Sequence, residues 1–174
     1  MKPTKISALA INAIATVVIA YIIVTLMVGA GFAVPVSGIN LVLTMPAIGL
    51  VNMLLVLPIL RYKKALADYL MGVGRSRPKR PEPFYAVRVL TIAKASALAG
   101  AWFTGWHAGV VLVQLTNQEF TEAVWREAFG GIGSVLLVVA ALIAERSCRL
   151  PDDGDDKKQA GSVAEPKPAG PISA

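Results

Sequence analysis

The polar side chains that could do chemistry in this chain are few, and most of them lie inside long apolar segments. The stretch 84–115 carries Lys94 and Ser96 near one end and His107 near the other, with Arg88 shortly before them. A lysine at the centre of a bilayer costs roughly 2.5–3.5 kcal/mol, so it is kept there only with a partner or a function. These four residues are therefore the candidate functional polar residues.

Three roles are open for Lys94, because the stretch 84–115 is longer than the about 20 residues that cross a bilayer. If the hydrocarbon core ends near Leu115, Lys94 lies at the membrane edge and its side chain reaches the headgroups. If the core begins near Val87, the lysine is buried and needs an interhelical contact, a substrate or an ion. We expect the first arrangement, in which Lys94 is an interfacial residue.

His107 is the only histidine, and one imidazole cannot build a metal site by itself. The carboxylates of Glu119 and Glu122 could approach it from the loop that follows and form a proton-sensitive pair. A structural histidine at the membrane interface is the simpler expectation. The single cysteine, Cys148, excludes an intramolecular disulfide and a CxxC motif.

No catalytic or phosphate-binding motif is present in the sequence. HExxH, GxSxG and P-loop patterns are absent. The glycine-rich segment 130–134 (GGIGS) lies in an apolar run and does not match GxGxxG. We therefore expect no enzymatic activity, no cofactor and no metal site.

Small residues recur at every fourth position of the stretch 84–115, and they include Ala97, Ala101, Gly105 and Gly109. This spacing places them on one stripe of a helix, where small side chains let another backbone approach closely. The last two also form a GxxxG pair, a motif for helix packing. The facing helix could be the last apolar segment of the chain or a helix of a second chain. We expect packing within the chain.

The composition is that of a membrane protein. Of the 174 residues 55% are hydrophobic, and the mean hydropathy is +0.61, which is too apolar for an ordinary soluble domain. The apolar residues form runs long enough to cross the ~30 Å hydrocarbon core as helices. We predict an all-α, polytopic protein with four transmembrane helices, at about residues 6–28, 41–60, 87–115 and 124–144. They form one domain, 1–150, followed by a disordered cytoplasmic tail, 151–174.

The positive charges indicate the orientation of these helices. Lysine and arginine concentrate before the first helix, in the segment 61–83 and after the fourth helix, whereas the other two connections carry none. Cytoplasmic loops carry the excess of lysine and arginine in membrane proteins. Both termini are therefore predicted to be cytoplasmic, in a multi-pass protein of the plasma membrane (the cell inner membrane) of a bacterium.

The segment 61–83 is the most basic part of the chain. Its first part, 61–70, could continue the second helix, and the prolines up to Pro83 are expected to keep the rest non-helical. Each lysine or arginine near an anionic leaflet contributes about 1 kcal/mol of attraction. We therefore expect this segment to bind anionic lipids. The net charge of +6 then needs no nucleic acid as a partner.

Three pieces of the sequence carry a resemblance to a known family: MKPTK at the start, RVLTIAKASALAG at 88–100 and ERSCRLPD at 145–152. Together they resemble a family of small actinobacterial membrane proteins that is classed as a domain of unknown function. The resemblance covers about residues 1–153. It implies a four-helix membrane protein, and members are often encoded near folate-pathway enzymes. It supports attention to Arg88, Lys94 and Ser96 but implies no activity.

Two functions fit these observations. The preferred one is a non-enzymatic accessory, assembly or interaction protein that acts through helix packing, with a second copy or another membrane protein as its partner. The alternative is a small transporter or permease-like subunit that works as an oligomer. In that case Asn12, Asn52, Lys94 and Ser96 would line a polar path through the membrane.

Overall fold

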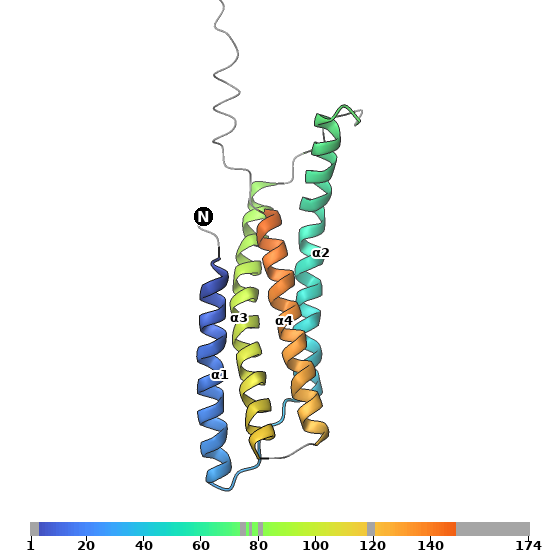
Figure 1. The fold of residues 1–174 in the computed structure, drawn as a ribbon. Helices are drawn as coiled ribbons and strands as arrows, with labels where there is room; N and C mark the ends of the chain where they lie inside the picture. Colours follow the sequence, from blue (N-terminus) through green and yellow to red (C-terminus); the bar gives the residue numbers. More distant parts are fainter. Residues whose placement is uncertain (1–3, 74–75, 77, 80–81, 118–120, 149–174) are drawn as a thin grey trace, which may run out of the picture.

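Four long helices make up the structure, a computed structural model that describes residues 4–73, 76, 78–79, 82–117 and 121–148. In chain order they are α1 (Ile6–Gly29), α2 (Ile39–Leu70), α3 (Pro83–Thr116) and α4 (Glu122–Cys148) (Figure 1). All four are long and apolar enough to cross a membrane. The predicted all-helical, four-span class is therefore confirmed, and the described residues contain no strand.

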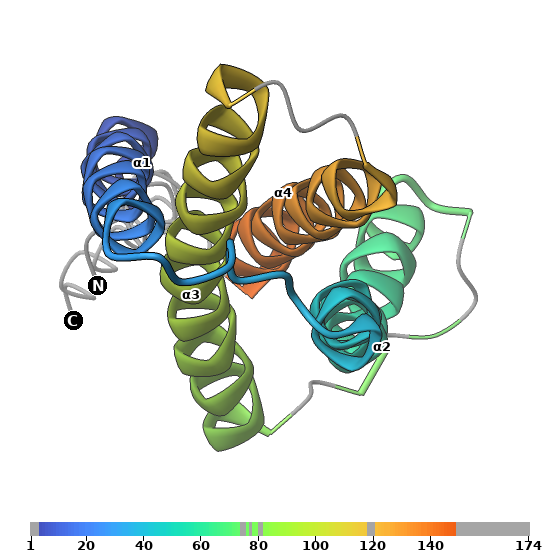
Figure 2. The ribbon, with the colours of Figure 1, turned by 90° about the horizontal axis from the view of Figure 1, so that it is seen from below.

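The helices are arranged around a central pair. α3 packs against α4, α1 packs against α3, and α2 packs mainly against α4. Viewed along the bundle, α1 and α2 lie on opposite sides of this pair (Figure 2). In the described part of the chain, α1 makes no close backbone contact with α2 or α4. The four helices therefore form an open row rather than a closed four-helix bundle.

The outward faces of this row are strongly apolar. Ile14 and Leu26 on α1 are 65% and 68% exposed, and Leu43 and Leu50 on α2 are each 62% exposed. In water such surfaces would drive aggregation, whereas in a bilayer they contact lipid chains at no penalty. The open arrangement is therefore compatible with a protein that sits in a membrane.

Small apolar clusters fill the interior along the length of the bundle. One cluster joins α2, α3 and α4 through Val56, Val89 and Ala144. It lies at the end of the bundle where α4 ends. Another joins α1 to α3 through Val24 and Val110 at the opposite end. These clusters fix the order of the helices and hold α3 at the centre.

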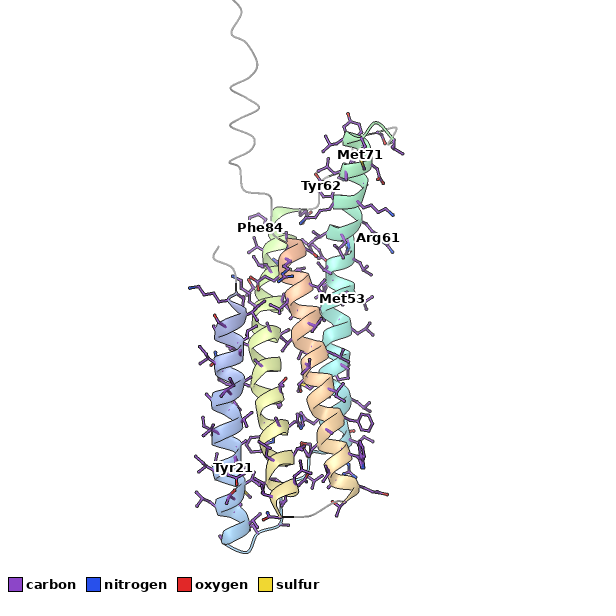
Figure 3. The ribbon with its side chains drawn as sticks, viewed as in Figure 1. Tyr21, Met53, Arg61, Tyr62, Met71 and Phe84 are labelled. Atoms are coloured by element: carbon purple, nitrogen blue, oxygen red, sulfur yellow. The ribbon has the colours of Figure 1, made fainter. Side chains whose placement is uncertain are left out.

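α2 is the one helix that reaches well beyond its neighbours. Its 32 residues span about 48 Å at 1.5 Å per residue, more than the ~30 Å hydrocarbon core. Tyr62 and Met71 mark the projecting end (Figure 3). The helix passes through Pro46 and Pro58, and it is followed by Gly72 with φ +75°, a conformation that glycine adopts without strain.

α3 begins at Pro83, so the expectation that the prolines keep this part non-helical is wrong at its last residue. Proline is tolerated in the first turn because its missing N–H would have no partner there. The predicted disordered tail, 151–174, lies outside the described residues, as do Arg75, Arg77 and Arg80 of the basic segment.

Candidate functional site

The four candidate polar residues of α3 do not form one cluster. Arg88 is exposed, Lys94 is half-buried, and Ser96 is 9% exposed. Lys94 is engaged in an interaction, and His107 lies three helical turns further along. The structure therefore separates a polar region around Lys94 and Ser96 from a second one around His107.

In the first region, Ser96 is joined to α2. Asn52 is 1% exposed, and its Nδ2 donates to Ser96 Oγ at 3.0 Å and to the carbonyl of Ile48 at 3.1 Å. Asn12, by contrast, donates to the carbonyl of Ala8 within α1. Two members of the polar path considered for a transporter thus meet, whereas Asn12 uses its amide within its own helix.

The small-residue stripe of α3 packs inside the chain. Ala97 and Ala101 are buried with Leu9 of α1 and Ala141 of α4. A Cβ at Gly109 would lie 2.6 Å from Ala20 Cβ. These residues therefore face α1 as well as α4, and α1 was not considered as their partner from the sequence.

The same holds for the first glycine of the GxxxG pair. A Cβ at Gly105 would collide with the carbonyl oxygen of Ala13 in α1. The pair is therefore occupied by a contact within the chain, and it is not a free surface for a second copy.

His107 is the centre of the second region. Its Nδ1 lies 2.6 Å from Glu127 Oε2, and both side chains are fully buried. When Glu127 is ionised it can only accept hydrogen bonds, and Nδ1 then carries the proton of this contact. The Nε2 atom is buried without a hydrogen-bond partner among the described residues. A buried imidazole–carboxylate pair thus joins α3 to α4.

The connection between α1 and α2, residues 30–38, adds a third element to this pair. The backbone N–H of Ser37 donates to Glu127 Oε1, and Ser37 Oγ lies 3.1 Å from Glu127 Oε2. One carboxylate therefore accepts three hydrogen bonds, from α3 and from the connection. We call His107, Glu127 and Ser37 the carboxylate cluster.

A glycine of α4 makes room for the imidazole. A Cβ at Gly130 would lie 2.6 Å from His107 Cε1 and 2.9 Å from both ring nitrogens. A Cβ at the next residue, Gly131, would meet His107 Cβ at 3.6 Å, an ordinary contact. The ring therefore lies directly against the backbone of α4 at Gly130, which only glycine allows.

Glu127 was not named as the partner of His107 from the sequence. Of the two carboxylates that were named, Glu122 is exposed and Glu119 lies outside the described residues. A signal was nevertheless present: Glu127, Gly130 and Ser134 follow one another at helical spacing and continue the buried face of α4. A carboxylate at the start of a stripe of small residues indicates an inward-facing group.

Beside the carboxylate cluster, α3 and α4 form an open groove of about 410 Å³. Its lining residues are Thr104, His107, Ala108, Val111, Glu127, Ala128, Gly131, Ile132, Val135 and Leu136. Apart from the buried pair and one threonine, the lining is apolar. The groove is suited to an apolar occupant from the membrane.

The geometry of the cluster favours holding elements together over group transfer. The Ser37 hydroxyl bonds to the carboxylate and not to the imidazole, so His107 is not placed to take its proton as a general base. No group of three or more metal-ligating side chains occurs in the part of the chain that the structure describes. What the cluster does is join α3, α4 and the 30–38 connection.

A second buried carboxylate lies at the other end of α4. Glu145 is 2% exposed, and its Oε1 accepts a hydrogen bond of 2.8 Å from the backbone N–H of Thr4. This contact ties the chain before α1 to the end of α4. This contact of Glu145 was not expected from the sequence.

Comparison with known proteins places the chain in a family. No curated protein and no solved structure matches it. A family model described as "Protein of unknown function (DUF3180)" matches residues 9–152, which include α2, α3 and α4 and all but the first three residues of α1. The chain belongs to this family of proteins of unknown function.

Proposed function

We propose that this protein is a non-enzymatic accessory or assembly subunit that binds a transmembrane helix of a partner protein in the groove between α3 and α4. The observation that carries the proposal is the groove itself. It lies on the central helix pair, and small half-buried residues such as Ala108, Ala128 and Gly131 line it. Small residues at a helix surface let a second backbone approach closely in a membrane.

The shape of the groove supports a helix as its occupant. Its lining residues span 104–111 on α3 and 127–136 on α4, which is about 10 and 14 Å along the helix axes. That length matches two to three turns of a third helix. The remaining outward faces present large side chains such as Ile14 and Leu43, which suit lipid chains.

The setting of this function follows from the charges. Both termini and the basic segment 61–83 are proposed to lie in the cytoplasm, and the membrane is proposed to be the plasma membrane of a bacterium. Arg61 and Lys64 are exposed where α2 leaves the apolar segment, at a height that suits contact with anionic headgroups. This contact would set how deeply the bundle lies in the membrane, and therefore the level at which the groove faces the lipid.

Site-directed photocrosslinking in native membranes tests the proposal. A photoreactive amino acid at Ile132, which is 56% exposed at the groove, is expected to give one discrete protein adduct. The same probe at Ile14, on the outward face of α1, is the matched control and is expected to give none. Mass spectrometry of the adduct identifies the bound helix.

A second pair of variants checks that the groove is the binding surface. Ala108→Phe fills the groove and is expected to abolish the adduct at Ile132, whereas Ala47→Phe, at an exposed alanine of α2, leaves it unchanged. Equal crosslinking at Ile132 and Ile14 would contradict the proposal. An adduct that contains only a second copy of this chain would replace the accessory role with self-association.

A further inference from the structure

The carboxylate cluster lies at the end of the bundle where α1 connects to α2 and α3 to α4. Ser37 makes the hydrogen bonds that join the 30–38 connection to the interior, because its N–H and its hydroxyl both bond to Glu127, and Val34 packs against the apolar cluster of Val24, Val110 and Val113. Figure 2 shows this connection crossing the end of α3 on its way to α2. Its position is therefore tied to the state of a single carboxylate.

Few other charges lie near this carboxylate. α1 and the 30–38 connection contain no charged residue, the first charge of α2 is Arg61, and Arg88 and Lys94 lie toward the opposite end of α3. On α4, Glu122 and Arg126 are nearby in sequence but exposed to the surroundings. Among the described residues, His107 is therefore the one titratable group that faces Glu127 from a packed element.

The two protonation states of Glu127 differ in what they can hold. An ionised carboxylate accepts hydrogen bonds from all three donors, and charged acceptors make the stronger bonds. Protonation removes the charge of the carboxylate, so the hydrogen bonds from Ser37 become weaker neutral ones, and the acid proton takes up one acceptor position of the carboxyl. His107 carries a proton on Nδ1 in its charged form and in one of its two neutral tautomers, and both of these forms can donate to the ionised carboxylate.

We propose that the carboxylate cluster is a proton-controlled latch that closes the 30–38 connection over the ends of α3 and α4. Ionised Glu127 holds Ser37 and keeps this end closed at neutral and higher pH. Protonation of Glu127 at acid pH releases Ser37, and the connection moves away. The latch does not depend on the groove binding a partner, and it acts in the isolated protein.

This end of α3 also holds two buried polar atoms that have no hydrogen-bond partner among the described residues. Gln114 is 1% exposed, and its Oε1 has no hydrogen-bond partner among the described residues. His107 Nε2 is in the same situation. Water that reached either atom in the open state would satisfy it and so favour that state.

Distance measurements between two spin labels test the latch in the full chain, reconstituted in lipid nanodiscs. One label at Val36, which is 42% exposed, and one at Leu115, 41% exposed at the end of α3, report the position of the connection. Cys148 is replaced by alanine to leave two labelling sites. We expect a narrow distance distribution at about pH 7 and a longer, broader one at about pH 3, which lies below the ordinary glutamate pKa of about 4.3.

Two carboxylate variants separate the latch from other effects of acid. Glu127→Gln cannot ionise, so its distribution is expected to be broad at both pH values. Glu122→Gln removes an exposed carboxylate of the same helix and is expected to keep the wild-type pH response. An unchanged wild-type distribution at acid pH would overturn the proposal, and so would an equal pH response in Glu127→Gln.

A milder variant and a second readout keep the test decisive if Glu127→Gln does not fold. Ser37→Ala removes only the hydroxyl bond, and its distribution is expected to broaden at a higher pH than that of the wild type. Because the chain has one histidine, ¹⁵N-histidine NMR gives the signals of His107 alone. The Nδ1 signal is expected to change over the pH range in which the label distance changes, and independent changes would contradict the latch.

Discussion

At the residue scale, the interior of this protein shows how few polar groups a membrane bundle can hold. The buried side chains Asn52 and Ser96 bond to each other, and His107 and Glu127 do the same. In hydrocarbon an unpaired polar group is expensive, so Asn52 and Glu127 each bond to a side chain of α3, whereas Ser134 and Ser147 bond to carbonyl oxygens of their own helix. The two pairs join α2 to α3 and α3 to α4, and they thereby define the register of the central helices.

Two neighbouring glycines of α4 test how closely the imidazole of His107 packs against this helix. Gly130→Ala is expected to destabilise the protein by about 1–3 kcal/mol, as overpacking does, because the new methyl group overlaps the His107 ring. Gly131→Ala is the control, since its methyl group makes an ordinary contact and alanine favours helix by about 1 kcal/mol. Reversible unfolding in mixed micelles measures both, and equal stabilities would rule out the tight contact.

The buried amide–hydroxyl pair is measured by a double-mutant cycle. Asn52→Val, Ser96→Ala and the double variant are expected to give a coupling free energy of about 0.6 kcal/mol, the average for interhelical hydrogen bonds in a membrane. The coupling is small because these groups also find hydrogen-bond partners when the helices are apart in the membrane. Thr91→Ala, at an exposed residue whose hydroxyl bonds within α3, paired with Asn52→Val should give no coupling.

What the sequence could predict at this scale was limited by long-range contacts. His107, Ser96 and the small-residue stripe stand out in sequence, because a single histidine or a repeated small residue is visible locally. Glu127 is visible only as an inward-facing carboxylate and Ser37 not at all, because the contact that joins them spans 90 residues of chain. The alternatives considered for His107, Glu119 and Glu122, were the carboxylates nearest in sequence, and sequence distance was the wrong guide.

At the scale of elements, close packing of α1 against α3 depends on two glycines. Gly105→Ala is expected to destabilise this helix pair, because a Cβ there collides with backbone atoms of α1, which cannot move aside as a flexible side chain can. Gly29→Ala, where a Cβ meets nothing within 4 Å, is the matched control. Thermal unfolding in detergent should show a lower midpoint for the first variant alone, and a normal midpoint would contradict this packing.

The elements themselves were largely predictable, and their ends were less so. Hydropathy identifies four spans because each needs about 20 apolar residues, and the structure has four helices of that kind. Hydropathy does not reveal that α2 continues through 61–70 or that α3 starts at Pro83. Those ends are set by helix propensity, by the tolerance of proline in a first turn and by the glycine after α2.

At the scale of the whole molecule, an open row of helices leaves much apolar surface to the bilayer. In an 18-residue apolar stretch of α1, only 11% of the residues are buried within the chain. Because lipid chains are as apolar as leucine, such a face is not by itself a sign of a missing partner. The groove between α3 and α4 differs from these faces by its small lining residues, and this difference is the reason to look for a partner there.

The orientation of the molecule is the last property that the charges predict. The connection between α1 and α2 carries no lysine or arginine, whereas the segment after α2 is strongly basic, so the two should lie on opposite sides of the membrane. Phe32→Cys and Met71→Cys, at residues 65% and 70% exposed, place one thiol on each side in a Cys148→Ala background. In intact cells a membrane-impermeant maleimide is expected to label only the first, and to label the second after permeabilisation. Labelling of Met71→Cys alone in intact cells would mean the opposite orientation, and the carboxylate cluster would then face the cytoplasm.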